Sequence, residues 1–280
     1  MMRTYSEILS VQNARVKEWA SLLERRGRDK QGKYLIEGYH LIEEALKAGA
    51  GVETILFLAD KGLPGELASL GGAAAAEWIG VSSAVLAKCS DAQTPQGVLA
   101  IVAKPEVGAD ALLAGAHDLV VVLDGVQDPG NLGTIIRSAD AVGANAVVLG
   151  RGTVDLYNPK TIRSTMGSLY HLPIVEADLA ELLPHARERG VRLVTTSLQA
   201  QRSCYETDLR EPAWLILGNE AKGVSPGVAA LSDVQVIIPM QGQAESLNVA
   251  MAATVLLFEA MRQRIDPAQI NSSCVSNDYS

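Results

Sequence analysis

Three apolar, strand-like runs, at 119–123, 214–217 and 236–238, each lead into polar residues. The side chains that could take part in catalysis or binding are Asn131 and Arg137 after the first run, Glu220 after the second, and Ser246 and Asn248 after the third. Strands that alternate with helical segments predict an α/β fold with a mostly parallel sheet. Ligands bind such sheets beyond the carboxyl ends of the strands, so we expect these residues to share one site.

The polar segment after the first run predicts a helix with Asn131 as its N-cap and Gly143 as its stop. Apolar residues recur at helical spacing at Leu132, Ile135, Ile136, Ala139 and Val142. Arg137 lies almost opposite the centre of this stripe, so it is expected to face away from the core. A guanidinium stays protonated in proteins, so its planar fork suits a phosphate clamp better than proton acceptance. The alternative for Arg137 is an ion pair with Asp140.

The other four polar candidates also have structural alternatives. The Glu220 carboxylate suits orienting a guanidinium or a hydroxyl, or it is a charge at the start of the next helix that stabilises by about 0.3–1 kcal/mol. Asn131 positions a substrate, caps its helix, or does both. Ser246 and Asn248 shape their loop or bind substrate, and Ser246 is also a possible cap of the last helix.

In residues, order and spacing these segments resemble the three motifs of SPOUT-class RNA 2′-O-ribose methyltransferases of the SpoU/TrmH family, over 118 to about 264. The resemblance implies a deep trefoil knot near the C-terminus, which general topology rules would exclude. It implies catalytic roles for the five polar residues and a ribose 2′-hydroxyl of rRNA or tRNA as substrate. It also implies S-adenosyl-L-methionine as cofactor, bound at Thr196, Gly218, Ile238, Met240 and Leu247.

The N-terminal part resembles the same family's RNA substrate-binding module more loosely, at 13–17, 32–38 and 43–46. The chain has a net charge of −8, but residues 1–33 hold eight Lys and Arg against four Asp and Glu. A local basic patch can contact phosphates on an acidic protein, and the alternative is a solvated helix face. The candidate RNA ligands are Arg15, Lys17, Arg25, Arg26, Arg28 and Lys33, together with Arg163 in a segment resembling the family's RNA-facing loop.

These patterns predict two domains. A small α/β domain is expected at 1–105, with a basic arm at 1–33 that is helical to about residue 30. A linker is expected at 106–117 and a methyltransferase domain at 118–265. The polar tail at 266–280 is expected to be disordered. The last helix carries alanines on more than one face, so it needs additional cover and predicts a homodimer.

Several function classes are disfavoured. The glycines at 125, 130 and 133 fit neither common phosphate-loop pattern. The histidines and cysteines have no ligand spacing, so no metal site is expected. The longest apolar run, 249–258, is shorter than the roughly 18 residues of a membrane span, and no signal peptide is seen, which predicts a cytoplasmic protein. Two alternatives remain: a non-catalytic RNA-binding module, disfavoured by the full set of catalytic candidates, and an antibiotic-resistance rRNA methyltransferase of the same family.

Overall fold

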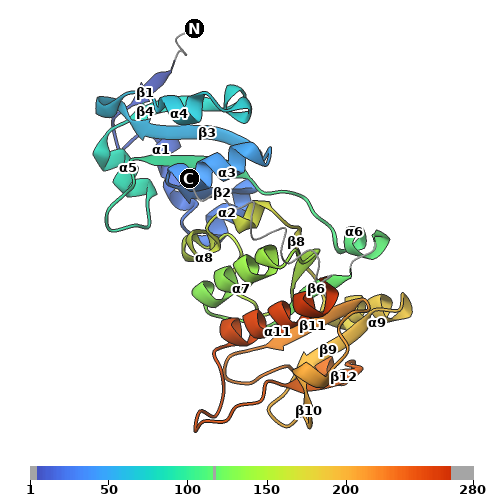
Figure 1. Cartoon of the computed structure of the whole chain (residues 1–280). Coiled ribbons are helices and arrows are strands. Elements are labelled where there is room, and N and C mark those ends of the chain that lie inside the picture. The colour runs from blue at the N-terminus through green and yellow to red at the C-terminus, as the bar shows by residue number, and fades with distance from the viewer. Residues whose placement is uncertain (1–4, 116–117, 266–280) are drawn as a thin grey trace. The chain divides into compact units, whose positions relative to one another are not determined.

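The structure is a computed structural model that describes residues 5–115 and 118–265 (Figure 1). The predicted disordered tail, 266–280, lies outside the described residues. By their contacts the residues form two compact units. The N-terminal unit consists of the described parts of Met1–Val107, Asp128–Arg137 and Val154–Pro173. The C-terminal unit consists of the described parts of Gly108–Gln127, Ser138–Thr153 and Ile174–Ser280.

The N-terminal unit is built on a five-stranded mixed sheet in the order β1-β4-β3-β5-β2. The strands are β1 (Ser6–Ile8), β2 (Lys33–Glu37), β3 (Val52–Leu58), β4 (Glu77–Val81) and β5 (Val98–Ala103). β1, β4 and β3 are parallel to one another, while β5 is antiparallel to both β3 and β2. The strands predicted at 34–37, 54–58 and 97–103 are confirmed within a residue or two at each end.

Helices cover both faces of this sheet because its central strands alternate buried side chains between the two faces. One apolar cluster joins Tyr34 and Ile55 to the helices α3 (Tyr39–Lys47) and α4 (Gly65–Ala68). Residues of the segment 157–170, which contains α8 (Pro159–Thr165), pack into the same cluster. A second cluster joins Leu35 and Leu56 to α1 (Ala14–Ser21) and α5 (Ser83–Cys89).

The expectation that residues 1 to about 30 form a helical arm is only partly right. α1 and α2 (Arg25–Gln31) are helical, but β1 precedes them and pairs in parallel with β4. The ring of Tyr5, beside β1, packs edge-on against Phe57 at 5.1 Å between centroids. A strand this short is fixed by tertiary pairing and by such a contact, which local sequence does not reveal.

The C-terminal unit contains a seven-stranded sheet in the order β10-β12-β9-β11-β6-β7-β8. Its strands are β6 (Leu119–Asp124), β7 (Ala146–Leu149), β8 (Ile174–Glu176), β9 (Arg192–Thr196), β10 (Arg202–Ser203), β11 (Ala213–Gly218) and β12 (Val234–Ile237). Every neighbouring pair is parallel, so the predicted parallel sheet is confirmed. Gly218 at the end of β11 pairs with Asp124 at the end of β6, which brings two of the polar segments to the same edge.

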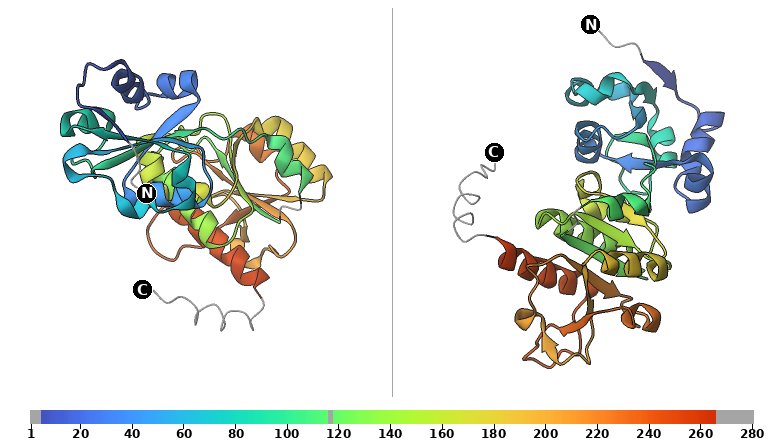
Figure 2. Two further views of the ribbon diagram at one scale, coloured as in Figure 1. Left: turned by 90° about the horizontal axis from the view of Figure 1, so that it is seen from above. Right: turned by 90° about the vertical axis from the view of Figure 1, so that its right-hand side faces the viewer.

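Three helices, α6 (Ala109–Ala114), α9 (Leu179–Glu188) and α10 (Pro226–Ala229), supply side chains to one apolar cluster of this sheet. The last helix, α11 (Val249–Arg264), contacts β11 and lies along the sheet in both views of Figure 2. At its C-terminal end the Arg264 guanidinium donates to the carbonyl oxygens of Leu209, Glu211 and Asp118 at 2.7–2.9 Å.

Two further predicted features differ from the structure. The segment expected to be a linker contains α6, whose Leu112 is buried in the C-terminal unit. Helix α7 (Pro129–Ala141) begins before Asn131, so Asn131 is not its N-cap. Asp128 takes that role, because its Oδ1 accepts the Asn131 backbone N–H at 2.9 Å. Pro129 suits the first helical position, since it lacks an N–H and has a helix-like φ.

Candidate active site

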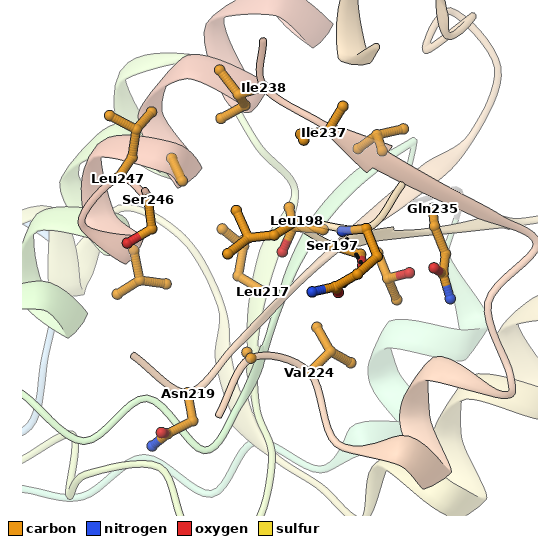
Figure 3. Close-up of a pocket in the computed structure, with 18 of the residues that line it drawn as sticks. Ser197, Leu198, Leu217, Asn219, Val224, Gln235, Ile237, Ile238, Ser246 and Leu247 are labelled. Carbon is orange, nitrogen blue, oxygen red and sulfur yellow. Dashed lines mark hydrogen bonds between the residues drawn. The ribbon is translucent and has the colours of Figure 1, made fainter. Parts of the chain in front are cut away.

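A cavity of about 430 Å³ lies at the carboxyl ends of β9, β11 and β12 (Figure 3). All five residues predicted to bind the cofactor line it, namely Thr196, Gly218, Ile238, Met240 and Leu247. Glu220 and Ser246 line it as well. Residues that are far apart in the sequence therefore meet in one cavity of the C-terminal unit.

The cavity combines an apolar interior with polar groups at its margin. Leu217, Val224 and Ile238 supply apolar surface, and Leu247 and Leu198 are apolar side chains that stay 40% and 56% exposed. Such a mixture is typical of sites that bind a small molecule with an apolar ring and polar ends.

The sequence did not identify the part of this lining that follows β9. Ser197, Leu198 and Gln199 line the cavity beside Gln235 of β12. The Ser197 hydroxyl donates to Gln199 Oε1 at 3.0 Å, which orients that amide. Their position directly after Thr196, at the end of a parallel strand, is the signal that would have found them.

Gly218 has no side chain because the backbone of its own loop occupies that space. A Cβ atom on Gly218 would overlap the carbonyl group of Gly223 and the nitrogen of Val224. Asn219 and Gly223 exchange both backbone hydrogen bonds at 2.9 Å, which closes the loop tightly, and Gly223 has a φ of +69°. Only glycine permits this approach of backbone to backbone.

Side chains tie this loop to the loop after β6. Asn219 Nδ2 donates to the Gly125 carbonyl oxygen at 2.9 Å, while Asn219 Oδ1 accepts two N–H groups of its own loop. The Glu220 carboxylate accepts the Gln127 N–H at 3.1 Å. Asp124 Oδ2 accepts the Ser225 N–H at 2.7 Å. Three links therefore hold the two loops in one arrangement, and the sequence assigned none of them.

The segment between β12 and α11 is mostly exposed, including Ser246 and Asn248. Asn248 is the N-cap of α11, since its Oδ1 accepts the N–H groups of Ala250 and Met251 at 2.9 and 3.4 Å. Ser246 is therefore not the cap, which corrects the alternative considered from the sequence. An N-cap at this position fixes where the exposed loop ends.

Helix α7 carries the remaining two catalytic candidates. Arg137 is exposed, as its helical position predicts, whereas Leu132, Ile135 and Ile136 are fully buried. The Asn131 backbone bond holds the pKa of Asp128 below its usual value, with help from Lys160 Nζ at 3.3 Å from Asp128 Oδ2. By contacts, Asn131 and Arg137 group with the N-terminal unit, whereas Glu220, Ser246 and Asn248 group with the C-terminal unit.

The candidate RNA ligands differ in their availability. Lys17 and Arg26 are exposed. Four others pair with carboxylates: Arg15 with Glu77, Arg25 with Asp29, Lys33 with Glu53 and Arg163 with Asp91. All four of these pairs are at least partly exposed, so solvent still reaches the cations and the pairs contribute little energy.

Arg28 is a correction, because it is 2% exposed and cannot contact RNA from the surface. Its Nε lies 3.1 Å from Asp155 Oδ2, and its Nη1 donates to the carbonyl oxygens of Leu22 and Leu23 at 2.8 Å. The charge of Arg28 is thus used inside the N-terminal unit. Composition alone places Arg28 in the basic patch of residues 1–33, because composition does not show whether a residue is buried.

Within 5–115 and 118–265, no group of three or more His, Cys, Asp or Glu side chains is placed to hold a metal ion. No helix of the described residues is long and apolar enough to cross a membrane.

Comparisons with known proteins bear on the whole chain. Residues 118–258 match the SpoU rRNA Methylase family, and residues 13–100 match the MRM3-like substrate binding domain. The chain is 39% identical to the 23S rRNA (guanosine(2553)-2'-O)-methyltransferase RlmP of Bacillus subtilis, covering 90% of this chain and 98% of that protein. It is 34% identical to a 23S rRNA (uridine(2479)-2'-O)-methyltransferase of Streptomyces viridochromogenes, covering 92% of both proteins.

Solved structures agree with these relatives. The AdoMet-bound rRNA methyltransferase of Sinorhizobium meliloti is 31% identical, with a TM-score of 0.84 over 94% of this chain and 99% of that chain. The α/β fold of this chain is therefore shared with a solved rRNA methyltransferase. The chain belongs to the SpoU rRNA methylase family, as the motif resemblance predicted.

Proposed function

We propose that this protein transfers a methyl group from S-adenosyl-L-methionine to a ribose 2′-hydroxyl of ribosomal RNA. The observation that carries the proposal is the cavity of the C-terminal unit, which is lined by every residue expected to bind this cofactor. Two relatives that align over most of the chain methylate riboses of 23S rRNA, according to their names. This family membership and the complete catalytic set disfavour a non-catalytic RNA-binding module.

The cavity suits the proposed cofactor in size and chemistry. Its apolar surface at Leu217, Ile238 and Leu247 fits an adenine ring, and the tightly closed loop after Gly218 forms part of its wall. S-adenosyl-L-methionine supplies a methyl group on an electrophilic sulfonium, so the attacking alcohol need not be fully ionised beforehand. Thr196 and Met240 complete the proposed binding set.

We propose that the catalytic side chains bind and orient the target ribose. We assign Arg137 to clamping the phosphate next to the target ribose, because it is exposed and its fork matches phosphate oxygens. Asn131 positions the ribose. Glu220 lines the cavity, and we assign its carboxylate to orienting the hydroxyl. Ser246 and Asn248 shape the exposed loop before α11.

We assign initial RNA contact to the N-terminal unit. Lys17 of α1 and Arg26 of α2 are exposed cations, and Arg15, Arg25, Lys33 and Arg163 can exchange their surface carboxylate partners for phosphates. Arg28 is left out because it is buried. The family matches at 13–100 and 118–258 support this division of labour and the proposed division of the sequence into domains at 1–105 and 118–265, although by contacts the segments 128–137 and 154–173 group with the N-terminal unit.

The proposal includes a homodimer formed through α11. Met251 and Phe258 are 52% and 43% exposed and lie seven residues apart, with Val255 between them on the same helical face. Such an apolar stripe favours burial against a second copy. Sedimentation should give a dimer for the wild type and a monomer for Phe258→Glu. A monomeric wild type with full activity would contradict this part.

The proposed fold includes the family's trefoil knot. Its support is the strand order, in which β12 lies between β9 and β10 while the following helix α11 contacts β11. Because the proposed substrate is ribosomal RNA, we also expect the protein to act in the cytoplasm.

Methyl transfer in vitro tests the proposal. The purified protein, incubated with labelled S-adenosyl-L-methionine and unmodified 23S rRNA, should place label on a ribose without added metal. Label on a base, or none on any rRNA while the cofactor binds normally, would contradict it.

A further inference from the structure

We infer that Tyr39, His40 and Met166 form a surface of the N-terminal unit on which an unpaired base of the RNA substrate stacks. This inference rests on the proposed function and names a contact that the catalytic set does not contain. The three side chains are exposed, Tyr39 to 45% and Met166 to 52%. We call them the stacking surface.

Contacts join His40 of α3 to the turn that contains Met166. The His40 Nε2 atom lies 3.1 Å from the Met166 carbonyl oxygen, so the ring nitrogen donates and the imidazole is fixed. Next to it, Gly167 lies so close to α3 that an added Cβ would be 2.9 Å from Glu44 Cγ. Glu44 in turn contacts His171 Nε2 at 2.9 Å. Both ends of this turn are therefore attached to α3.

Met166 has a backbone conformation that its side chain does not favour. Met166 has a positive φ of 51° and is the one non-glycine residue with a positive φ among the described residues. It directly follows the end of α8. Glycine or asparagine would adopt this conformation at lower cost. Burial of the Met166 side chain does not offset the cost of this backbone conformation, since about half of the residue is exposed to solvent. Exposed residues held in rare conformations are concentrated at binding sites.

The chemistry of the stacking surface fits a nucleobase. A phenol ring and an imidazole offer flat faces, and an exposed thioether is polarisable and adaptable. Helix α8, whose C-cap is Met166, carries two cations six and three residues before it: the side chains of Lys160 and Arg163 are 57% and 36% exposed. Their present partners, Asp128 and Asp91, are exposed carboxylates that phosphates can displace. Flat apolar groups beside cations favour single-stranded RNA over a protein partner.

Binding of an rRNA fragment to full-length variants tests this inference. Tyr39→Ala combined with Met166→Gly should lower RNA affinity by about 5- to 150-fold, the range expected for losing one stacked base. Met166→Gly also removes the unfavourable conformation, so thermal stability should be kept or raised. Tyr39→Phe should bind like the wild type, because stacking needs the ring alone. Tyr205→Ala, at a tyrosine of the C-terminal unit that is 54% exposed, is the matched control.

The salt dependence separates stacking from charge. The double variant should keep the wild-type slope of log affinity against log salt, whereas Arg26→Ala should reduce the slope by about 1. Photocrosslinking of RNA to the tryptic peptides that contain Tyr39 or Met166 should be lost only in the double variant. If the wild type methylates rRNA but the double variant binds it equally well, this inference is wrong and the proposed function stands. If the wild type binds rRNA and methylates no ribose, the proposed function is wrong instead.

Discussion

Asn219 Nδ2 donates a hydrogen bond to the carbonyl oxygen of Gly125 across 2.9 Å, and this bond joins the ends of two adjacent parallel strands. The Glu220 carboxylate adds a second link, because it accepts the Gln127 N–H. The wall of the cavity formed by β11 is thus fixed before any ligand arrives. Preorganisation of this kind lowers the ordering cost of binding.

Gly218→Ala tests that wall. The added methyl group would overlap backbone atoms of Gly223 and Val224, so the loop must open. We expect a loss of about 1–3 kcal/mol in unfolding free energy and at least a tenfold loss in cofactor affinity, measured by denaturation and calorimetry. The control is Gly227→Ala in α10 (Pro226–Ala229), where an added Cβ meets nothing within 4 Å and the change should be neutral or stabilise by up to about 1 kcal/mol. Equal cofactor binding by Gly218→Ala would refute the close-packing argument.

Arg28 and Arg26 lie two residues apart on α2 but should have opposite roles. Arg28→Ala leaves the nearly buried Asp155 without its partner and should cost about 3–5 kcal/mol of stability. Arg26→Ala removes an exposed charge, so it should change stability by no more than about 0.5 kcal/mol while weakening RNA binding. Chemical denaturation and RNA titration distinguish the two. A stable Arg28→Ala protein with weakened RNA binding would reverse our assignment.

Arg137 separates binding from chemistry. Since Arg137 is not among the residues that line the cavity, Arg137→Ala should leave cofactor affinity unchanged while methyl transfer falls about 100-fold or more. Arg137→Lys keeps the charge but loses the two-pronged fork, so it should recover part of the rate. Calorimetry measures the cofactor affinity, and single-turnover assays measure the rate of methyl transfer. Wild-type transfer by Arg137→Ala would remove Arg137 from the mechanism and move attention to Glu220.

Asp128 predicts a pH dependence of stability. Its pKa is lowered in the folded protein, mainly by the Asn131 backbone bond, so its charge stabilises the fold above the unfolded pKa of about 3.9. That contribution is lost as the pH falls through the lower, folded pKa. Asp128→Asn keeps a cap acceptor but has no charge to lose. The unfolding free energies of the two proteins should differ at pH 7, and this difference should shrink only as the pH falls below about 4 and through the folded pKa of Asp128. A difference in unfolding free energy that does not change with pH would contradict this role of the Asp128 charge.

The sequence predicted the residues of the cavity better than the helix cap and the buried ion pair elsewhere in the fold. Periodicity predicted a parallel sheet whose strand ends converge on one site, whereas the assignment of Thr196, Ile238 and Leu247 to the cofactor came from the family resemblance. The helix start at Pro129 was missed because the capping group, Asp128, competes with Asn131 for the same role. The burial of Arg28 was missed because its partner Asp155 lies 127 residues away. Local composition cannot distinguish a surface cation from one whose partner arrives through tertiary folding.

The central claim is methylation of a ribose in ribosomal RNA. Mass-spectrometric mapping of 2′-O-methylated riboses in 23S rRNA should be made from cells with the gene, cells without it, and cells that carry only the Arg137→Ala form. We predict that at least one ribose methyl group is lost without the gene, is restored by the wild type and is not restored by Arg137→Ala. Identical ribose methylation maps of 23S rRNA in the three strains would contradict the account.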